Sequence, residues 1–117
     1  MELIALLSSN KETWSQVSGL IKNGDWDKVI VLGDDSGTNF SVENKRFEFI
    51  NIDLTKKLIP LKQEMLKELK GKISGLEVAL TIASGSGKEH MALCSALLSI
   101  PTGIRFTALT KEGIVFL

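Results

Sequence analysis

The sequence predicts a single α/β domain built around a mostly parallel six-stranded sheet. Three short apolar runs, Leu3–Leu7, Val29–Leu32 and Val78–Ala83, do not alternate apolar with polar residues, as is typical of strands buried on both faces. Helical patterns separate these runs, and strands that alternate with helices indicate parallel pairing with right-handed crossovers. No repeat or boundary interrupts the 117 residues, so we expect one domain over residues 1–117, with Leu3–Leu7 as its central strand.

Start and stop signals mark the first two helices. Ser9 and Glu12 form the pattern of a capping box, so the first helix is expected to have its N-cap at Ser9. The second helix is expected to begin near Pro60, because proline is favoured at the first helical position. It is expected to end by Gly71 or Gly75, since glycine commonly follows the last helical turn.

A third helix is expected from about residue 88 to residue 99, directly after Gly87. Apolar residues occupy nearly all of its sides, so we expect it to be mostly buried. These apolar residues are Met91, Leu93, Cys94, Leu97 and Leu98. Small residues at helical spacing permit close approach of another element, which is either the chain's own sheet or a second copy in a homodimer. These small residues are Ala92, Ser95, Ala96 and Ser99.

The remaining segments complete the sheet at its two sides. Arg46–Asp53 partly alternates apolar with polar residues, which suits a peripheral strand. Gly103–Thr110 and Ile114–Leu117 predict an antiparallel hairpin, in which Gly113 is expected to take the left-handed conformation. The polar segment Asp34–Lys45 stands where a helix is often found and is expected to be a loop, of a length that is usually functional or mobile.

The composition argues against several classes of protein. Lys plus Arg number 14 and Asp plus Glu number 14, and this zero net charge argues against a nucleic-acid coat or a double-stranded DNA-binding domain, which need a basic face. A single cysteine forms no internal disulfide, and no apolar run approaches the ~18 residues of a membrane span. The start of the sequence has a glutamate at position 2 and no basic segment, unlike a signal peptide, so we expect a cytoplasmic location without a membrane partner.

The segment Ser84–His90 carries the densest set of chemically useful residues. Two glycines, two serines, a lysine and the only histidine fall within seven residues, between an apolar strand and a helix. Ligands of open α/β sheets bind at the carboxyl ends of strands, where the free N–H groups and the dipole of a helix start favour an anion. Ser86 and Glu89 also form a capping-box pattern, so a capped helix start without a ligand is the competing interpretation.

Known phosphate and metal motifs do not match this chain. A Walker A loop needs glycine where the chain has Ile82, and Ser or Thr where it has Glu89. Asp34 and Asp35 could bind a metal, but two acids in a polar loop are more often solvated turn formers. A lone histidine such as His90 cannot build a multi-histidine metal site and is most often a hydrogen-bonded structural residue. Neither a metal nor a cofactor is therefore expected.

The order of elements and the loop before the third helix resemble those of the CARF family, the CRISPR-associated Rossmann fold domains. Members share a six-stranded Rossmann-like sheet, a polar turn after the first strand and a terminal antiparallel hairpin. Their most diagnostic segment is a strand, a loop similar to Thr-Gly-Gly-Thr-Lys and a helix rich in small residues. Here Gly85 matches the first glycine and Lys88 the lysine, whereas Ser84, Ser86 and Gly87 replace the first threonine, the second glycine and the second threonine.

This resemblance implies a homodimer that binds a cyclic oligoadenylate across its two-fold axis, as a sensor in CRISPR-linked antiviral signalling. The implied ligand-binding residues come from the first turn and from the loop before the third helix. They are Ser8, Ser9, Asn10, Ser84, Gly85, Ser86, Gly87 and Lys88. Some members also cleave their ligand slowly without a metal, using hydroxyls and the lysine to orient a ribose 2′-OH. Such an activity makes Lys88 and His90 the candidate catalytic residues.

Two other interpretations stay open. One is a small enzyme that acts, as a monomer, on a mononucleotide or another phosphate-bearing ligand at the same loop. The other is a non-catalytic interaction module in which the loop only caps a helix. Binding of one small ligand to one monomer favours the first, and a ligand screen without any thermal shift favours the second.

Overall fold

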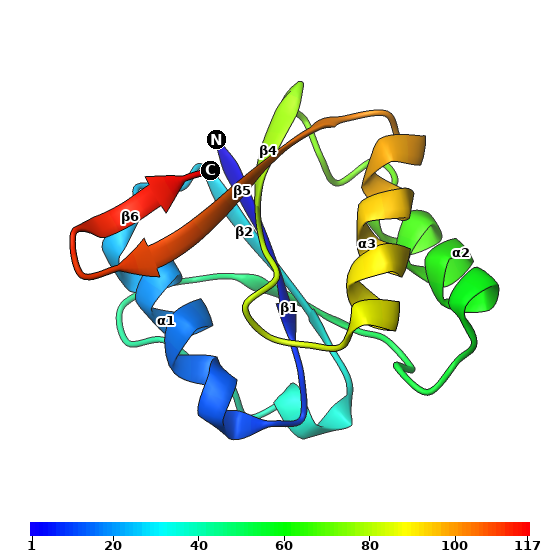
Figure 1. The fold of residues 1–117 in the computed structure, drawn as a ribbon, viewed down its shortest axis with the longest axis horizontal. Coiled ribbons are helices and arrows are strands. Elements are labelled where there is room, and N and C mark those ends of the chain that lie inside the picture. The colour runs from blue at the N-terminus through cyan, green and yellow to red at the C-terminus, as the bar shows by residue number, and fades with distance from the viewer.

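The computed structural model describes all of residues 1–117 and contains one six-stranded sheet (Figure 1). The strand order is β3-β2-β1-β4-β5-β6, and every neighbouring pair is parallel except β5 and β6, which are antiparallel. The strands are β1 (Glu2–Leu7), β2 (Lys28–Gly33), β3 (Glu48–Asn51), β4 (Glu77–Thr81), β5 (Gly103–Thr110) and β6 (Gly113–Phe116). The predicted fold class, a Rossmann-like mostly parallel sheet with a C-terminal antiparallel hairpin, is confirmed.

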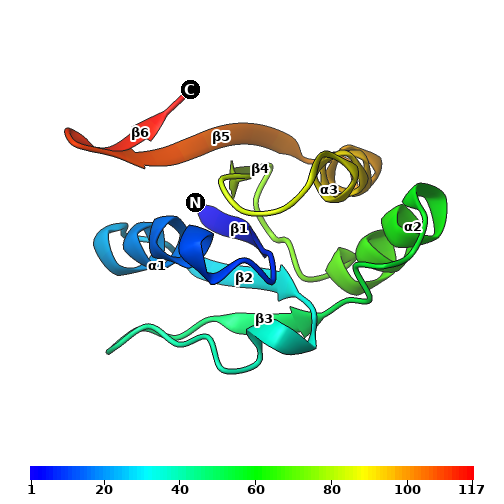
Figure 2. The same ribbon diagram turned by 60° about the horizontal axis from the view of Figure 1, so that its bottom comes forward.

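Helices cover both faces of the sheet, which leaves the strands as a middle layer. Figure 2 shows α1 (Trp14–Asn23) on one side of the strands, and α2 (Leu58–Leu69) and α3 (Gly87–Ser99) together on the other. Two short 3₁₀ turns, η1 (Lys11–Thr13) and η2 (Asp35–Gly37), lie after β1 and β2. No helix combines the length and the hydropathy that a bilayer-spanning segment needs.

β1 occupies the middle of the sheet, between β2 and β4, as predicted. All six of its residues are buried, because strands flank both of its edges and helices cover both of its faces. Glu2 is the one charged residue among them, and its carboxylate accepts the main-chain N–H groups of Ser74 and Gly75 at 3.1 and 3.0 Å. A buried carboxylate is tolerated when its oxygens are paired in this way.

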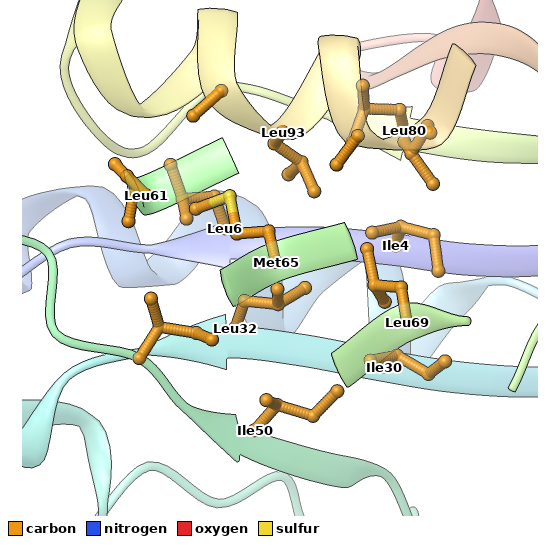
Figure 3. Close-up of a cluster of buried hydrophobic side chains, with 14 of the residues drawn as sticks. Ile4, Leu6, Ile30, Leu32, Ile50, Leu61, Met65, Leu69, Leu80 and Leu93 are labelled. Atoms are coloured by element: carbon orange, nitrogen blue, oxygen red, sulfur yellow. The ribbon is translucent and has the colours of Figure 1, made fainter. Parts of the chain in front are cut away.

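Two apolar cores lie on opposite faces of the sheet. The larger core joins the strands to α2 and α3, and Figure 3 shows Leu6, Leu32 and Leu93 gathered around Met65 of α2. The smaller core joins the other face of the strands to α1, where Leu20 is fully buried. Successive residues of β1 enter these two cores in turn, so both sets must be apolar and the strand shows no alternation.

Several boundaries differ from the prediction by one or two residues. α2 begins at Leu58 rather than near Pro60, and proline is tolerated there because the first N–H groups of a helix lack intrahelical partners. Gly71 follows the end of α2 with a φ of +85°, and Gly113 in the hairpin loop has the predicted left-handed conformation, with a φ of +104°. β3 covers only the middle four residues of the predicted segment 46–53.

α3 is less buried than its composition predicts. The prediction of a mostly buried helix is wrong, because Met91 and Leu98 are 59% and 62% exposed. Ala92 and Ala96 are fully buried in the chain's own core, so these two small residues serve packing within the chain. Met91 and Leu98 are seven residues apart and therefore project from the same outward side of the helix, with Ser95 between them.

Candidate functional site

The candidate site lies where the strand order of the sheet reverses. β2 and β4 pair with opposite edges of β1, so the chain segments that leave β1 and β4 start side by side and run to helices on opposite faces. Ligands of open α/β sheets bind in the crevice between two such segments. The structure joins the segments directly, because the N–H of Ser8 donates to Oγ of Ser84 at 2.8 Å. The first turn and the loop before α3, two segments singled out from the sequence, are thus brought together.

The first turn is capped by Asn10 rather than by Ser9. Oδ1 of Asn10 accepts the N–H of Glu12 at 3.1 Å and caps η1, so α1 begins only at Trp14. The predicted capping box at Ser9 is therefore wrong. The short Asn10 side chain reaches the N–H two residues ahead and starts a 3₁₀ turn in place of the α-helix. Ser9 and Asn10 are both exposed and remain accessible to a ligand.

Two residues outside the predicted set hold the first turn in place. Nε1 of Trp14 donates to the carbonyl of Ser8 at 2.8 Å, and the hydroxyl of Thr13 lies 2.7 Å from Oγ of Ser84. Thr13 carries no sequence signal of its own. It becomes recognisable as part of the site only once β1 and β4 are known to be neighbours in the sheet.

The loop before α3 is shaped by a glycine and closed by a capping box. Gly85 has a φ of +110°, and a Cβ there would lie 2.4 Å from Cδ2 of Leu6, so glycine alone fits. The hydroxyl of Ser86 accepts the N–H of Glu89, and the carboxylate of Glu89 accepts the N–H of Ser86 at 3.0 Å. The predicted capping box at Ser86 is thus present and fixes the start of α3.

In the segment Gly85–Lys88, three main-chain N–H groups have no acceptor in the protein, those of Gly85, Gly87 and Lys88. Gly87 and Lys88 are the first two residues of α3, where no intrahelical partner exists. A Cβ at Gly87 would meet nothing within 4 Å, so the space next to the helix start is open. These donors and the dipole of α3 together favour an anion at this point.

The side chain of Lys88 reaches a neighbouring segment instead of standing free. Its Nζ donates to the carbonyl oxygens of Leu54 and Lys56 at 3.0 and 2.8 Å, which ties α3 to the connection between β3 and α2. An ammonium group has three N–H donors, so one remains for a ligand. Lys88 is exposed, and its charge therefore remains accessible from solvent.

His90 is oriented by the loop before α3. Its Nε2 lies 2.8 Å from the carbonyl oxygen of Ser84, and because a carbonyl only accepts, Nε2 must carry the proton. When Nε2 carries the only ring proton, Nδ1 is left as an acceptor. His90 is thus a hydrogen-bonded structural residue that retains one nitrogen able to accept a proton.

A hollow of about 540 Å³ lies further along the same edge of the sheet, after β2 and β3. Its lining is polar and acidic, and consists of Asp34, Asp35, Ser36, Asn51, Ile52, Asp53 and Thr55. Hydrogen bonds from the hydroxyl and N–H of Thr55 lower the pKa of Asp53 below its usual value, and the charges of Lys56 and Lys88 add to this effect. Asp53 therefore stays ionised, and the hollow is unfavourable for a phosphate.

The two acids predicted as turn formers have that role in this hollow. Oδ1 of Asp34 accepts the N–H of Ser36 at 3.0 Å and caps η2, and Oδ1 of Asp35 accepts from Nδ2 of Asn51 at 2.6 Å. No group of three or more His, Cys, Asp or Glu side chains is placed to hold a metal ion. Beyond η2 and two turns, the predicted loop 34–45 has no regular structure.

Comparison with known proteins identifies a structure with the same fold. No protein-family model matches the chain, and no curated protein matches it. Csm6 from Enterococcus italicus, solved bound to cyclic hexa-2'-fluoro-hexa-dAMP, is similar with a TM-score of 0.62 and 18% sequence identity. The similarity covers 94% of this chain and 33% of the Csm6 chain, so this chain spans about a third of the length of that protein.

Replacing Gly85 with alanine is expected to lower the free energy of unfolding by about 1–3 kcal/mol. The added Cβ collides with Leu6, and the positive φ is strained for any other residue. Chemical denaturation measures the loss, and Gly87→Ala is the matched control. A Cβ at Gly87 meets nothing, so that variant is expected to change stability by no more than about 1 kcal/mol, in the stabilising direction. Equal losses in both variants would contradict the conformation of the loop.

Proposed function

We propose that this chain is a CARF-like sensor domain that binds a cyclic oligoadenylate in the crevice between the first turn and the loop before α3. The observation that carries the proposal is the set of free N–H donors at Gly85, Gly87 and Lys88, at the point where the strand order reverses. The fold shared with a Csm6 solved with a cyclic hexa-nucleotide supports this ligand class. The proposed setting is CRISPR-linked antiviral signalling.

The site residues have different roles in this proposal. The phosphates of the ligand lie against the free N–H groups at the start of α3, with Lys88 supplying a positive charge. Ser9 and Asn10 are exposed and contact the ligand from the first turn. Ser84 is fully buried, so its hydroxyl shapes the crevice and does not itself reach the ligand.

We propose that two copies of the chain pair so that each contributes one crevice to a single ring. A ring of identical nucleotides is symmetric, and a two-fold dimer presents the same contacts twice. The outward side of α3 supports such pairing, because Met91 and Leu98 expose apolar side chains on the helix whose N-terminus forms the crevice.

Slow cleavage of the ring is a second proposed activity. It is favoured by the orientation of His90, whose Nε2 is hydrogen-bonded to the Ser84 carbonyl, which leaves Nδ1 available. In this reaction a ribose 2′-oxygen attacks the adjacent phosphorus, the bond from phosphorus to O5′ breaks, and a 2′,3′-cyclic phosphate remains. Nδ1 of His90 is free to accept the proton of the 2′-OH, and Lys88 carries charge for the phosphate. The departing O5′ takes up a proton, so the step is balanced without a cofactor.

The binding proposal is tested by titrating cyclic hexa-2'-fluoro-hexa-dAMP into wild type, Lys88→Ala and Lys67→Ala. Each charge-assisted phosphate contact contributes roughly 1.5–3 kcal/mol, so a Lys88 contact made in both copies of a dimer predicts a loss of about 3–6 kcal/mol. Lys67 is an exposed lysine of α2, and its loss is expected to leave the affinity unchanged.

Three outcomes decide among the proposed ligand classes. Equal affinities for all three proteins would remove Lys88 from the site. Binding of a mononucleotide by a monomer, without binding of the ring, would favour a small phosphate-ester enzyme. Binding of neither would favour an interaction module in which the loop only caps α3.

Replacing His90 is expected to affect cleavage much more than binding. His90→Gln keeps an N–H donor that can reach the Ser84 carbonyl but removes the basic nitrogen, whereas His90→Ala removes both. Cleavage of the ribose form of the ring, followed over hours, is expected to fall by at least about 100-fold in both variants. Affinity for the 2′-fluoro ring, which has no 2′-OH to attack, is expected to stay within about threefold in the glutamine variant. Undiminished cleavage in both variants would exclude His90 as the base.

The proposed dimer is tested by sedimentation equilibrium at high micromolar concentration. Wild type is expected to sediment as a dimer, and Leu98→Glu is expected to shift it toward monomer because a charge replaces an exposed apolar contact. Leu76→Glu is the matched control, since Leu76 is 94% exposed and lies in the turn before β4 rather than on α3. A monomeric wild type would count against pairing, and equal effects of the two variants would count against the outward side of α3 as the interface.

A further inference from the structure

We propose that Thr13 is a positioning residue of the candidate site, which locks the first turn and the loop before α3 into one rigid unit. This inference rests on the proposed function, because it assigns to Thr13 an effect on ligand affinity. Thr13 ends η1 and precedes the first residue of α1, so it is contributed by neither of the two predicted site segments.

The hydrogen bonds around Ser84 form a chain with one direction. The hydroxyl of Thr13 lies 2.8 Å from the carbonyl of Asn10, which only accepts, so Thr13 donates there. Thr13 must then accept from Ser84, whose Oγ lies 2.7 Å away. Oγ of Ser84 accepts the N–H of Ser8 at 2.8 Å. The hydroxyls of Ser84 and Thr13 therefore each donate once along this hydrogen-bond chain, which crosses from one loop to the other and back, and Oγ of Ser8 lies 3.4 Å from the Thr13 hydroxyl as a second, longer contact.

Because Ser84 is buried, this series of hydrogen bonds depends on Thr13. Ser84 is fully buried, so water cannot replace the acceptor that Thr13 supplies to its hydroxyl. The carbonyl of Asn10, in contrast, also accepts the N–H of Thr13 at 3.1 Å and stays paired without the Thr13 hydroxyl. Loss of that hydroxyl thus leaves one buried donor, on Ser84, without a partner.

Ser84 also sets the position of groups that face the ligand. Its carbonyl accepts from Nε2 of His90 at 2.8 Å, and the next residue, Gly85, carries the first of the free N–H donors. A displaced Ser84 therefore misplaces both an anion donor and the candidate base. Groups that are held in place before binding cost less entropy when the ligand arrives, so Thr13 raises affinity through Ser84 without touching the ligand.

The test compares Thr13→Val, which keeps the shape and removes the hydroxyl, with Thr13→Ser, which keeps the hydroxyl. Thr107→Val is the matched control, because the buried Thr107 donates to the carbonyl of Val115 at 2.9 Å in the distant hairpin. Two quantities are measured, the exchange rate of the Ser8 amide without ligand and the affinity for cyclic hexa-2'-fluoro-hexa-dAMP.

Thr13→Val is expected to speed exchange of the Ser8 amide about tenfold and to weaken binding about tenfold. This is the size of effect expected when one buried hydroxyl loses its hydrogen-bond partner. Thr13→Ser is expected to match wild type, and Thr107→Val is expected to lose stability without either effect. Ser84→Ala cuts the same chain from its other end, so the double variant with Thr13→Val is expected to bind no worse than Ser84→Ala alone.

The two arms separate this inference from the function on which it rests. Unchanged Ser8 exchange in Thr13→Val would overturn the lock between the loops, whatever the ligand. Faster exchange with unchanged affinity would overturn the positioning role. A wild type that binds no ring would overturn the proposed function, while the exchange arm, which uses no ligand, would still decide whether Thr13 joins the two loops.

Discussion

Complete burial of β1 is the constraint on which the rest of the molecule depends. The strand has neighbours along both edges and helices over both faces, so nearly every side chain from Glu2 to Leu7 is apolar. The one charged exception survives because Ser74 and Gly75 donate two N–H groups to its carboxylate. Ser8 is the first residue after the strand that is not fully buried, so polar side chains become possible there. This position lies at the edge of the sheet where the strand order reverses.

The same burial dictates the form of the candidate site. Leu6 fills the core directly beneath the loop before α3, so the loop must pass over it with a residue that has no side chain, Gly85. The gap between the segments after β1 and β4 is narrow, and small hydroxyl side chains span it, as Ser84 and Thr13 do. Core packing and the layout of the anion donors are therefore set by the same contacts.

Most of the architecture could be predicted from the sequence, because buried strands and helix caps are each recognisable from a few neighbouring residues. Apolar runs without alternation predicted the central strands, and Ser86 with Glu89 predicted the start of α3. Local signals failed where two of them competed, since Asn10 captured the turn that Ser9 was expected to cap. They also failed where exposure depends on neighbours, because nothing in the sequence of α3 tells Leu98, which is exposed, from Leu97, which is buried. The role of Thr13 could not be predicted either, because its hydrogen-bond partner, Ser84, is 71 positions away in the sequence.

The lengths of the strands bear on how the chain meets other copies of itself. The two edge strands, β3 and β6, have four residues each, whereas the inner strands have five to eight. A short edge offers few unpaired N–H and C=O groups, so it is a poor template for the addition of a further strand. Continuous sheets running from copy to copy, the usual route to aggregation of β-rich chains, are therefore disfavoured by the layout of the sheet itself. Copies of the chain are therefore expected to associate through side-chain surfaces. Such surfaces are more selective than strand edges, because they require complementary shape.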